Sequence, residues 1–434
     1  MALGGGTFTN YNKVLPGTYV NFVSALSASG EVSERGVCAV AIELDWGVEN
    51  EFFAVTADDF YTDSMKIFGY AYTHSKMRCM RDLFLNASKV YVYRLGEGVK
   101  AEGSFAKARY SGICGNNIKI RVSENIDDNS YFDVATYYSN VKRDVQKVKS
   151  AAELKDNDYV IWDTAATLEV CAATALTGGS NATVTGENYQ SFLDKCENIS
   201  FNVLAVASTD DNVNSLIAAY TKRMREERGV KFQSVLYKTE ADDIGVINVD
   251  TSVNDKMFNT ASFVWFVAGA AAGCEIYKSL TNRVYNGVFE LIGSYTQADL
   301  EAGIKKGKFI AHKVDDEWRI LADINSLVTT TAEMGEVFCE NQTVRIIDQI
   351  ACDDANLFKN KYLGMVPNDE AGRVSLWNDI TEHRKSLVKM RAIEPFKDED
   401  IEVKKGNNKT SVVILSKICP INSMTQLYIS TTVE

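Results

Sequence analysis

The residues closest to a catalytic or ligand-binding pattern follow an apolar strand expected at 201–207. Asp210 and Asp211 stand at its carboxyl end, where an open α/β sheet places ligands. Neither a GxGxxG nor a GxxxxGK[ST] motif accompanies them, so a phosphate group would lack its glycine-rich cradle. Capping of the next helix explains Ser208, Asp210 and Asp211 without a ligand, and we favour that interpretation.

The other candidate groups are scattered. There is no GxSxG elbow or HExxH motif, and His74, His312 and His383 are too far apart in sequence to suggest a triad or a zinc site. The nine cysteines include no CxxC pair, which predicts reduced, mostly buried thiols. We therefore expect no cofactor, no metal and no enzymatic activity. A soluble α/β enzyme of unrecognised class stays open as an alternative.

A third pattern is positive charge on one helix, expected at 379–391. Its cations are Arg384, Lys385, Lys389 and Arg391, in a chain whose net charge is −12. Lys385 and Lys389 are four residues apart and so share a helix face. This face is either simply solvated or a contact for an acidic partner. The acidic chain as a whole argues against nucleic-acid binding.

The elements that would position these residues alternate between strand and helix. This alternation, over 25–95 and again over 181–330, predicts an α/β core with a mixed sheet covered on both faces. Between the halves, 96–180 carries short alternating runs separated by Gly and Asn turns, which predicts an inserted small β domain. Residues 331–423 predict an α+β C-terminal domain.

Within these domains we expect particular elements. Helices are predicted at 75–87, 187–196, 211–229, 260–279, 344–362 and 374–392. One hairpin is predicted to join 309–312 with 318–321, and a final hairpin to join 411–415 with the last strand of the chain.

Both ends of the chain are predicted to be extended, strand-forming arms, at 1–24 and 424–434. Their characteristic residues are Phe8, Pro16, Gly17, Tyr19, Val20 and Phe22 at the front and Leu427, Tyr428, Ile429 and Val433 at the back. A terminal strand can pair with its own sheet or with that of a neighbouring molecule. Two such ends without a catalytic motif favour an assembly subunit.

The sequence shows neither a signal peptide nor a membrane span. The N-terminus lacks the basic-then-apolar pattern of a signal peptide. The most apolar window, 263–273, is too short to cross a bilayer, which needs ~20 residues, and its small residues predict a helix packed closely inside the fold. We expect synthesis in the bacterial cytoplasm, no direct membrane insertion, and release by lysis.

Several runs occur in the order found in one family: 14–19, 35–40, 44–47, 112–118, 390–393 and the terminal hairpin. On these runs the chain resembles the contractile tail sheath proteins of phages and of phage-tail-like bacteriocins, in the style of Gram-positive prophage and diffocin-type sheaths. The resemblance covers nearly the whole chain and weakens over the insertion. Another self-assembling tubular or surface polymer is the second alternative.

The resemblance implies a structural subunit that stacks as six-fold rings around an inner tail tube. The arms would add strands to a sheet formed around 345–420 in neighbouring subunits, and the basic helix would face the tube. The inserted domain would lie outermost. Baseplate and tail terminator proteins would be further partners, and contraction would drive the tube through a target envelope.

Overall fold

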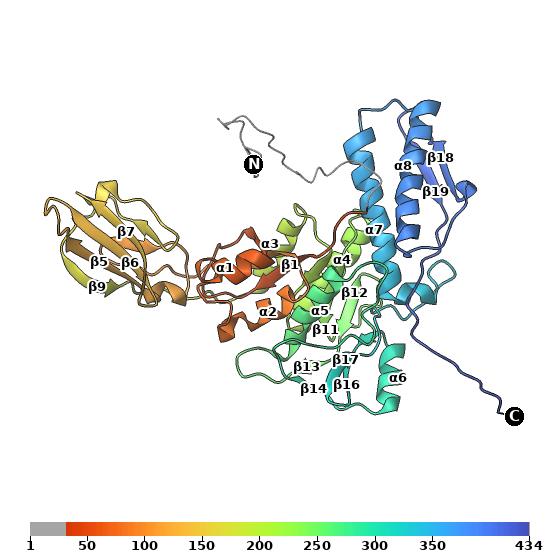
Figure 1. Cartoon of the computed structure of the whole chain (residues 1–434), viewed down its shortest axis with the longest axis horizontal. Coiled ribbons are helices and arrows are strands. Elements are labelled where there is room, and N and C mark those ends of the chain that lie inside the picture. The colour runs from red at the N-terminus through yellow and green to blue at the C-terminus, as the bar shows by residue number, and fades with distance from the viewer. Residues whose placement is uncertain (1–31, 434) are drawn as a thin grey trace, which may run out of the picture. The chain divides into compact units, whose positions relative to one another are not determined.

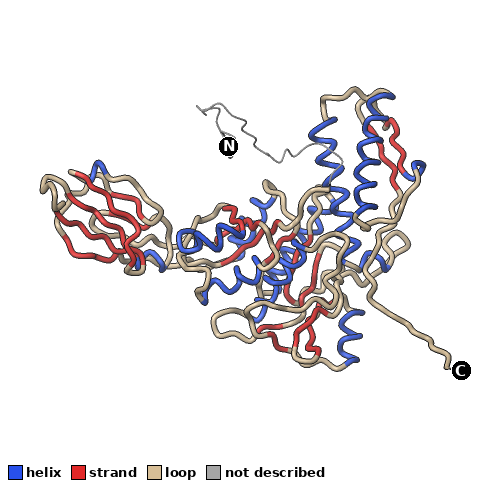
Figure 2. Tube along the Cα trace, in the orientation of Figure 1, coloured by secondary structure: helices blue, strands red, loops and turns tan. Residues whose placement is uncertain are grey.

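The computed structural model describes residues 32–433, which fall into two compact units. One unit comprises 34–349 and the C-terminal segment from Pro420 onwards, and the other is built mainly from Ile350–Cys419. Each unit has its own secondary structure (Figures 1 and 2). The fold is mixed α/β with several additional small sheets, as the sequence predicted.

A seven-stranded sheet forms the centre of the larger unit, in the order β15-β12-β11-β10-β1-β3-β2. Its strands are β1 (Val37–Ile42), β2 (Phe52–Thr56), β3 (Lys89–Arg94), β10 (Val203–Ala205), β11 (Gln233–Tyr237), β12 (Val246–Val249) and β15 (Lys308–Phe309). All neighbours are parallel except β2 and β3. Parallel strands must be buried on both faces, which explains the continuous apolar runs that revealed them.

Helices cover both faces of this sheet. They are α1 (Ala57–Phe68), α2 (Arg78–Phe84), α3 (Gly186–Cys196), α4 (Asp211–Glu226) and α5 (Phe263–Gly273). Helix α6 (Gln297–Lys305) lies beside the edge strand β15. Alternate strand residues send Val40 and Val92 into the core of α1, α2 and α5, and Ala41 and Tyr93 into the core of α3 and α4. Alternate residues of these strands therefore face opposite helical layers, so both faces of the sheet are apolar.

Helix α5 is packed closely, as its small residues predicted. A Cβ atom on Gly269 would lie 2.2 Å from the Leu83 carbonyl oxygen, and one on Gly273 would lie 2.1 Å from that of Asn86. Only glycine lets the backbones of α2 and α5 approach so closely. The predicted helix 260–279 was too long, because α5 ends at Gly273 and only a 3₁₀ turn, Thr260–Ser262, precedes it.

The segment 96–180 contains six strands. They are β4 (Ala106–Ala108), β5 (Ile118–Glu124), β6 (Phe132–Tyr138), β7 (Val141–Val148), β8 (Val160–Trp162) and β9 (Cys171–Ala175). Four form an antiparallel sheet in the order β7-β6-β5-β9, and β4 pairs with β8. The β6–β7 turn places Ser139 and Asn140 at positive φ, as tight hairpins require.

The remaining small elements of the larger unit are two antiparallel strand pairs and short turns. Strand β13 (Ser252–Val253) pairs with β14 (Leu291–Ile292), and β16 (Ala311–Val314) with β17 (Glu317–Ile320). The second pair is the hairpin predicted at 309–312 and 318–321, with its first strand two residues later. Single 3₁₀ turns lie at Ser75–Met77, Ile113–Asn117, Ala151–Glu153 and Glu336–Cys339.

The smaller unit packs two helices on a hairpin. Its elements are the end of α7 (Asn341–Leu357), a π-helical turn (Phe358–Tyr362), α8 (Glu370–Lys389), a 3₁₀ turn (Asp398–Asp400), β18 (Ile401–Lys405) and β19 (Val412–Ser416). Leu376 and Ile380 of α8 pack on Ile401 of β18. The predicted final hairpin was wrong: β19 pairs with β18, not with the last residues. The charged residues Glu402, Lys404 and Lys405 had hidden β18.

Trp46 joins the core of the inserted strands to the α/β sheet. It follows β1, yet its fully buried ring packs in the inserted domain against Tyr110, Tyr138 and Tyr159, with centroid distances of 5.2, 6.2 and 6.4 Å. Its indole Nε1 donates to the Lys66 carbonyl at 3.1 Å. One side chain of the core thus completes the hydrophobic interior of the insertion.

Two buried polar groups hold the same junction. The Arg94 guanidinium donates to the carbonyls of Leu44, Gly47 and Ser111 at 3.0–3.1 Å. Asp45 accepts from Tyr70, Asn181 and Lys76 at 2.6, 2.7 and 3.1 Å. Burial opposes its ionisation, but these hydrogen bonds outweigh burial and hold the pKa of Asp45 below its usual value.

Replacing Trp46 with alanine should open the inserted domain locally. Loss of a buried tryptophan costs about 3–5 kcal/mol because the cavity cannot fully collapse. Hydrogen exchange of the β5 and β6 amides should accelerate accordingly. The control is Ile126→Ala, since Ile126 is almost fully exposed and should change stability by less than about 0.5 kcal/mol. Equal protection in the two variants would contradict this role of Trp46.

Candidate functional site: the C-terminal arm and the basic helix

The acidic residues after β10 have a structural role. Asp210 is the N-cap of α4, and its carboxylate accepts from the Asn212 amide at 2.9 Å. Asp250 is paired with Lys308, whose Nζ lies 3.0 Å away. Within residues 32–433 no three His, Cys, Asp or Glu side chains gather in a way that could hold a metal ion. The capping interpretation is therefore confirmed.

The cysteines carry free thiols and are mostly enclosed. Five are buried, three are half-buried, and Cys419 is exposed. Burial raises the pKa of the Cys79 thiol to about 12, so it stays protonated and unreactive at neutral pH. These residues act as small apolar side chains, as their scattered spacing predicted.

The C-terminal arm starts from a polar clamp on the N-terminal end of α7. The Gln342 side chain donates to the Ile421 carbonyl at 3.1 Å and accepts from the Ser423 amide at 2.9 Å. Asn422 donates to the Glu340 carboxylate at 2.6 Å and to the Thr343 hydroxyl at 3.1 Å. Burial and the nearby Asp323 raise the pKa of Glu340, whereas the Asn422 hydrogen bond opposes that shift. The clamp fixes where the arm begins.

Beyond the clamp, the arm lies extended and unpaired. Leu427, Tyr428 and Ile429 are 82%, 86% and 76% exposed, and Val433 is also exposed. Within the described residues, 424–433 form no strand and no hydrogen bond with the rest of the chain. Consecutive apolar side chains so exposed usually mark a binding segment. The N-terminal residues Phe8, Pro16, Gly17, Tyr19, Val20 and Phe22 lie outside the described residues.

The β18–β19 hairpin presents unpaired strand edges. The two strands pair with each other at Ile401–Lys405 and Val412–Ser416, and no further strand of the described chain joins them. The Trp377 indole ties the hairpin to α8 through the Ile401 carbonyl at 2.8 Å. Val413, Ile414 and Leu415 of β19 are exposed apolar residues. An exposed edge of this kind is a template for another strand.

The basic helix differs from the prediction at one residue. Arg384 is only 1% exposed, and its guanidinium makes a two-point contact with Asp354 of α7 at 3.0 and 2.5 Å. Arg384 therefore belongs to the interior, because helical periodicity turns it towards α7 beside His383, whose Nε2 lies 2.8 Å from Asp353. This pairing could not be predicted from the residues around Arg384, since Asp354 lies thirty residues earlier in the chain.

The other three cations are exposed. Lys385 and Lys389 lie one turn apart on α8, and Arg391 follows the helix with φ of 62°. No residue of the described chain forms an ion pair with any of the three. Their role as a tube-facing surface stays a prediction.

A separate observation is that no described helix has the length and apolar character needed to span a bilayer.

Comparisons with known proteins cover the chain from end to end. Family models match as follows: the Gp18 domain III N-terminal region at 35–95, the phage tail sheath protein beta-sandwich domain at 96–181, the phage tail sheath protein central domain at 182–326 and the phage tail sheath C-terminal domain at 333–434.

Individual relatives agree with these models. "Phage-like element PBSX protein XkdK" of Bacillus subtilis (strain 168) is 31% identical, with 100% of both chains aligned. The solved sheath tail protein of Desulfitobacterium hafniense has a TM-score of 0.81 at 30% identity, covering 95% of this chain and 99% of that one. The contracted helical sheath of the anti-feeding prophage shares the fold, with a TM-score of 0.56 at 12% identity over 97% and 99% of the two chains.

The fold and the matching family models define a class of protein, the structural subunits of contractile phage and phage-tail-like sheaths. Four sheath models in chain order and a full-length relative at 31% identity identify the family. The chain belongs to the phage tail sheath protein family. This confirms the resemblance inferred from the sequence.

Arg384 and Lys385 are adjacent in sequence, but replacing each with methionine should change the stability of the subunit by very different amounts. Arg384→Met leaves Asp354 without its cation and should cost about 3 kcal/mol, the low end for a broken buried pair because Asp354 keeps some contact with water. Lys385→Met should change stability by less than about 0.5 kcal/mol. Hydrogen exchange of the α7 and α8 amides measures both. Similar opening in the two variants would show that Arg384 is not a structural cation.

Proposed function

We propose that this chain polymerises as stacked six-subunit rings around an inner tail tube and contracts to drive that tube through a target cell envelope. The observation that carries the proposal is the C-terminal arm, anchored at its root and apolar but unpaired beyond it. Membership of the tail sheath family supports the same reading. Such a subunit would work with baseplate and tail terminator proteins and leave its host cell by lysis.

Strand exchange would connect the subunits. Residues 1–24 and 424–434 act as donated arms, and the domain at 331–423 acts as acceptor through its β18–β19 hairpin. Backbone hydrogen bonds would supply affinity, and alternating side chains of the arm would set register. A two-stranded hairpin is only marginally stable by itself, so added strands would also stabilise the acceptor.

Stored conformational energy would drive contraction. Rigid domains repack into a shorter, wider lattice while the extended arms keep neighbouring subunits joined. No glycine-rich nucleotide-binding motif occurs in the sequence, so the proposal requires no nucleotide hydrolysis. The domain at 96–180 would lie on the outer surface of the sheath.

Removing residues 424–434 should abolish polymers and leave a folded subunit. The described arm makes no hydrogen bond with the rest of the chain, so its loss removes assembly contacts and no core packing. A sharper pair is Ile429→Pro against Ile429→Thr, because proline removes the amide that a pairing strand must donate whereas threonine keeps it. Negative-stain microscopy and sedimentation distinguish tubes from monomers. Regular tubes from the truncated chain would overturn strand exchange by this arm.

Reversing two charges should weaken attachment to the tube more than folding. The double variant Lys385→Glu/Lys389→Glu changes exposed cations that have no ion-pair partner among the described residues. Co-sedimentation with the inner tube protein should fall, and for the unchanged chain it should weaken as salt rises. Lys359→Glu/Lys397→Glu is the matched control, because it reverses two exposed cations of the same unit outside both α8 and the β18–β19 hairpin. Unchanged co-sedimentation of the α8 variant would remove the helix from the tube interface.

A further inference from the structure

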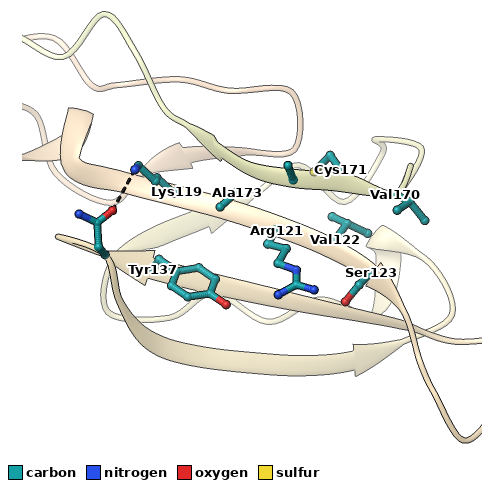
Figure 3. A pocket seen from close by; sticks show the side chains of 10 residues that line it. Lys119, Arg121, Val122, Ser123, Tyr137, Val170, Cys171 and Ala173 are labelled. Carbon is teal, nitrogen blue, oxygen red and sulfur yellow. Dashed lines mark hydrogen bonds between the residues drawn. The ribbon is translucent and has the colours of Figure 1, made fainter.

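We propose that the outer face of the four-stranded sheet β7-β6-β5-β9 binds an anionic carbohydrate polymer, with phosphate or carboxylate groups spaced along sugar or polyol units. The site is a shallow hollow of about 600 Å³, lined mainly by residues of β5, β6 and β9 (Figure 3). Binding by a single chain does not depend on polymerisation. Only its repetition along a sheath rests on the function proposed above.

The strand pattern separates a buried face from a cationic one. Ile118, Ile120 and Val122 of β5 point into the core of the inserted domain. Alternation therefore sends Lys119, Arg121 and Ser123 to the opposite face, where they line the hollow.

Arg121 is the central group of the hollow. It is exposed and has no hydrogen bond or ion pair with any residue of the described chain. The pairing of β5 with β9 shifts register between Ile120 and Val122, so β9 bulges at Ala172 and Ala173, opposite Arg121. Ala172 and Ala173 of β9 leave open space beside it. A free guanidinium above small side chains suits a phosphate or carboxylate, which it can bind at two points.

More cations continue across the same face. Tyr137 of β6 stands opposite Lys119 of β5 and Lys142 of β7, and Asp133 of β6 stands opposite Lys147 of β7. Among these paired residues, Asp133 carries the one carboxylate, and this group already accepts two hydrogen bonds from the Asn125 amide. Residues on one face of a strand repeat every ~6.6–6.8 Å, so successive anions of one polymer can reach separate cations. This excess of positive charge lies on an acidic chain.

The neutral groups of the hollow suit a sugar or polyol. Tyr137 makes no ring or cation contact with another described residue, so a face of its ring is available for stacking, and Figure 3 shows it on the same side as Arg121. Tyr131, by contrast, is covered by Lys147 and Lys149 at 4.9 Å. The Ser123 hydroxyl and the Asn140 amide, which accepts from Lys119 at 2.9 Å, border the hollow. One free ring with hydroxyl and amide groups fits a polyol better than a row of stacked bases.

The test is titration of the full-length chain with labelled oligomers of five kinds. Poly(glycerol phosphate) and polygalacturonate supply phosphate and carboxylate, dextran is the neutral control, and single-stranded DNA and poly-glutamate test other macromolecules. We expect one or both anionic carbohydrates to bind, dextran not to bind, and affinity to fall as salt rises. Comparing the two anionic probes identifies the group. Tightest binding of DNA or poly-glutamate, or equal binding of dextran, would overturn the proposal.

Variants assign the binding to this face. Arg121→Gln should weaken it about tenfold or more, since a charge-assisted contact is lost. Ala173→Glu adds a repelling carboxylate in the hollow without removing any contact. Lys107→Gln is the matched control, a charge loss on β4 of the same domain whose partner is the exposed Glu102. Unchanged affinity in both pocket variants, or equal loss in the control, contradicts the site. The chain lacking 424–434 should bind equally well, which would show that binding does not require assembly.

Discussion

The buried guanidinium of Arg94 is the constraint on which the arrangement of the larger unit depends. It sits at the end of β3 and holds carbonyls from the loop after β1 and from Ser111 of the insertion. If any of these three carbonyls moved away, the Arg94 charge would lose a hydrogen bond in a low-dielectric interior, which is energetically costly. Trp46 and Asp45 reinforce the same loop, so a domain inserted through two short connections is fixed by packing rather than by its connections.

The run 44–47, one of those on which the family resemblance rests, contacts the inserted segment at this junction. Asp45 binds Asn181, where the chain leaves the insertion, and its carbonyl oxygen would lie 2.2 Å from a Cβ atom on Gly112. Gly112 also has a φ of 113°, which only glycine adopts readily. The runs 44–47 and 112–118 thus form one contact. The need for glycine at position 112 follows from that close approach.

Local patterns predicted the elements, and distant pairings decided where prediction failed. Strand β10, predicted at 201–207, could be recognised because a strand buried on both faces forms a mostly apolar run. Strand β18 was missed because its exposed Glu402 and Lys404 interrupt the apolar residues, and the last hairpin was then paired wrongly. Arg384 was placed on the surface because its partner Asp354 comes from another helix. The carboxylate that neutralises Arg384 lies on α7, so the residues of α8 alone could not show that this cation is buried.

The polar clamp and the apolar arm together give a physical basis for the proposed strand exchange. Gln342 bonds the backbone on both sides of Asn422, so the direction of departure is set within the subunit. Residues 424–433 make no hydrogen bond with any other described segment. Leaving Leu427, Tyr428 and Ile429 in water forgoes about 1.5–3 kcal/mol for each large apolar side chain that burial would otherwise supply. In the proposed strand exchange, that deficit would exist only in the separate subunit. An acceptor that buries these side chains and pairs their amides recovers it, and the anchored root reduces the entropy lost when the arm docks.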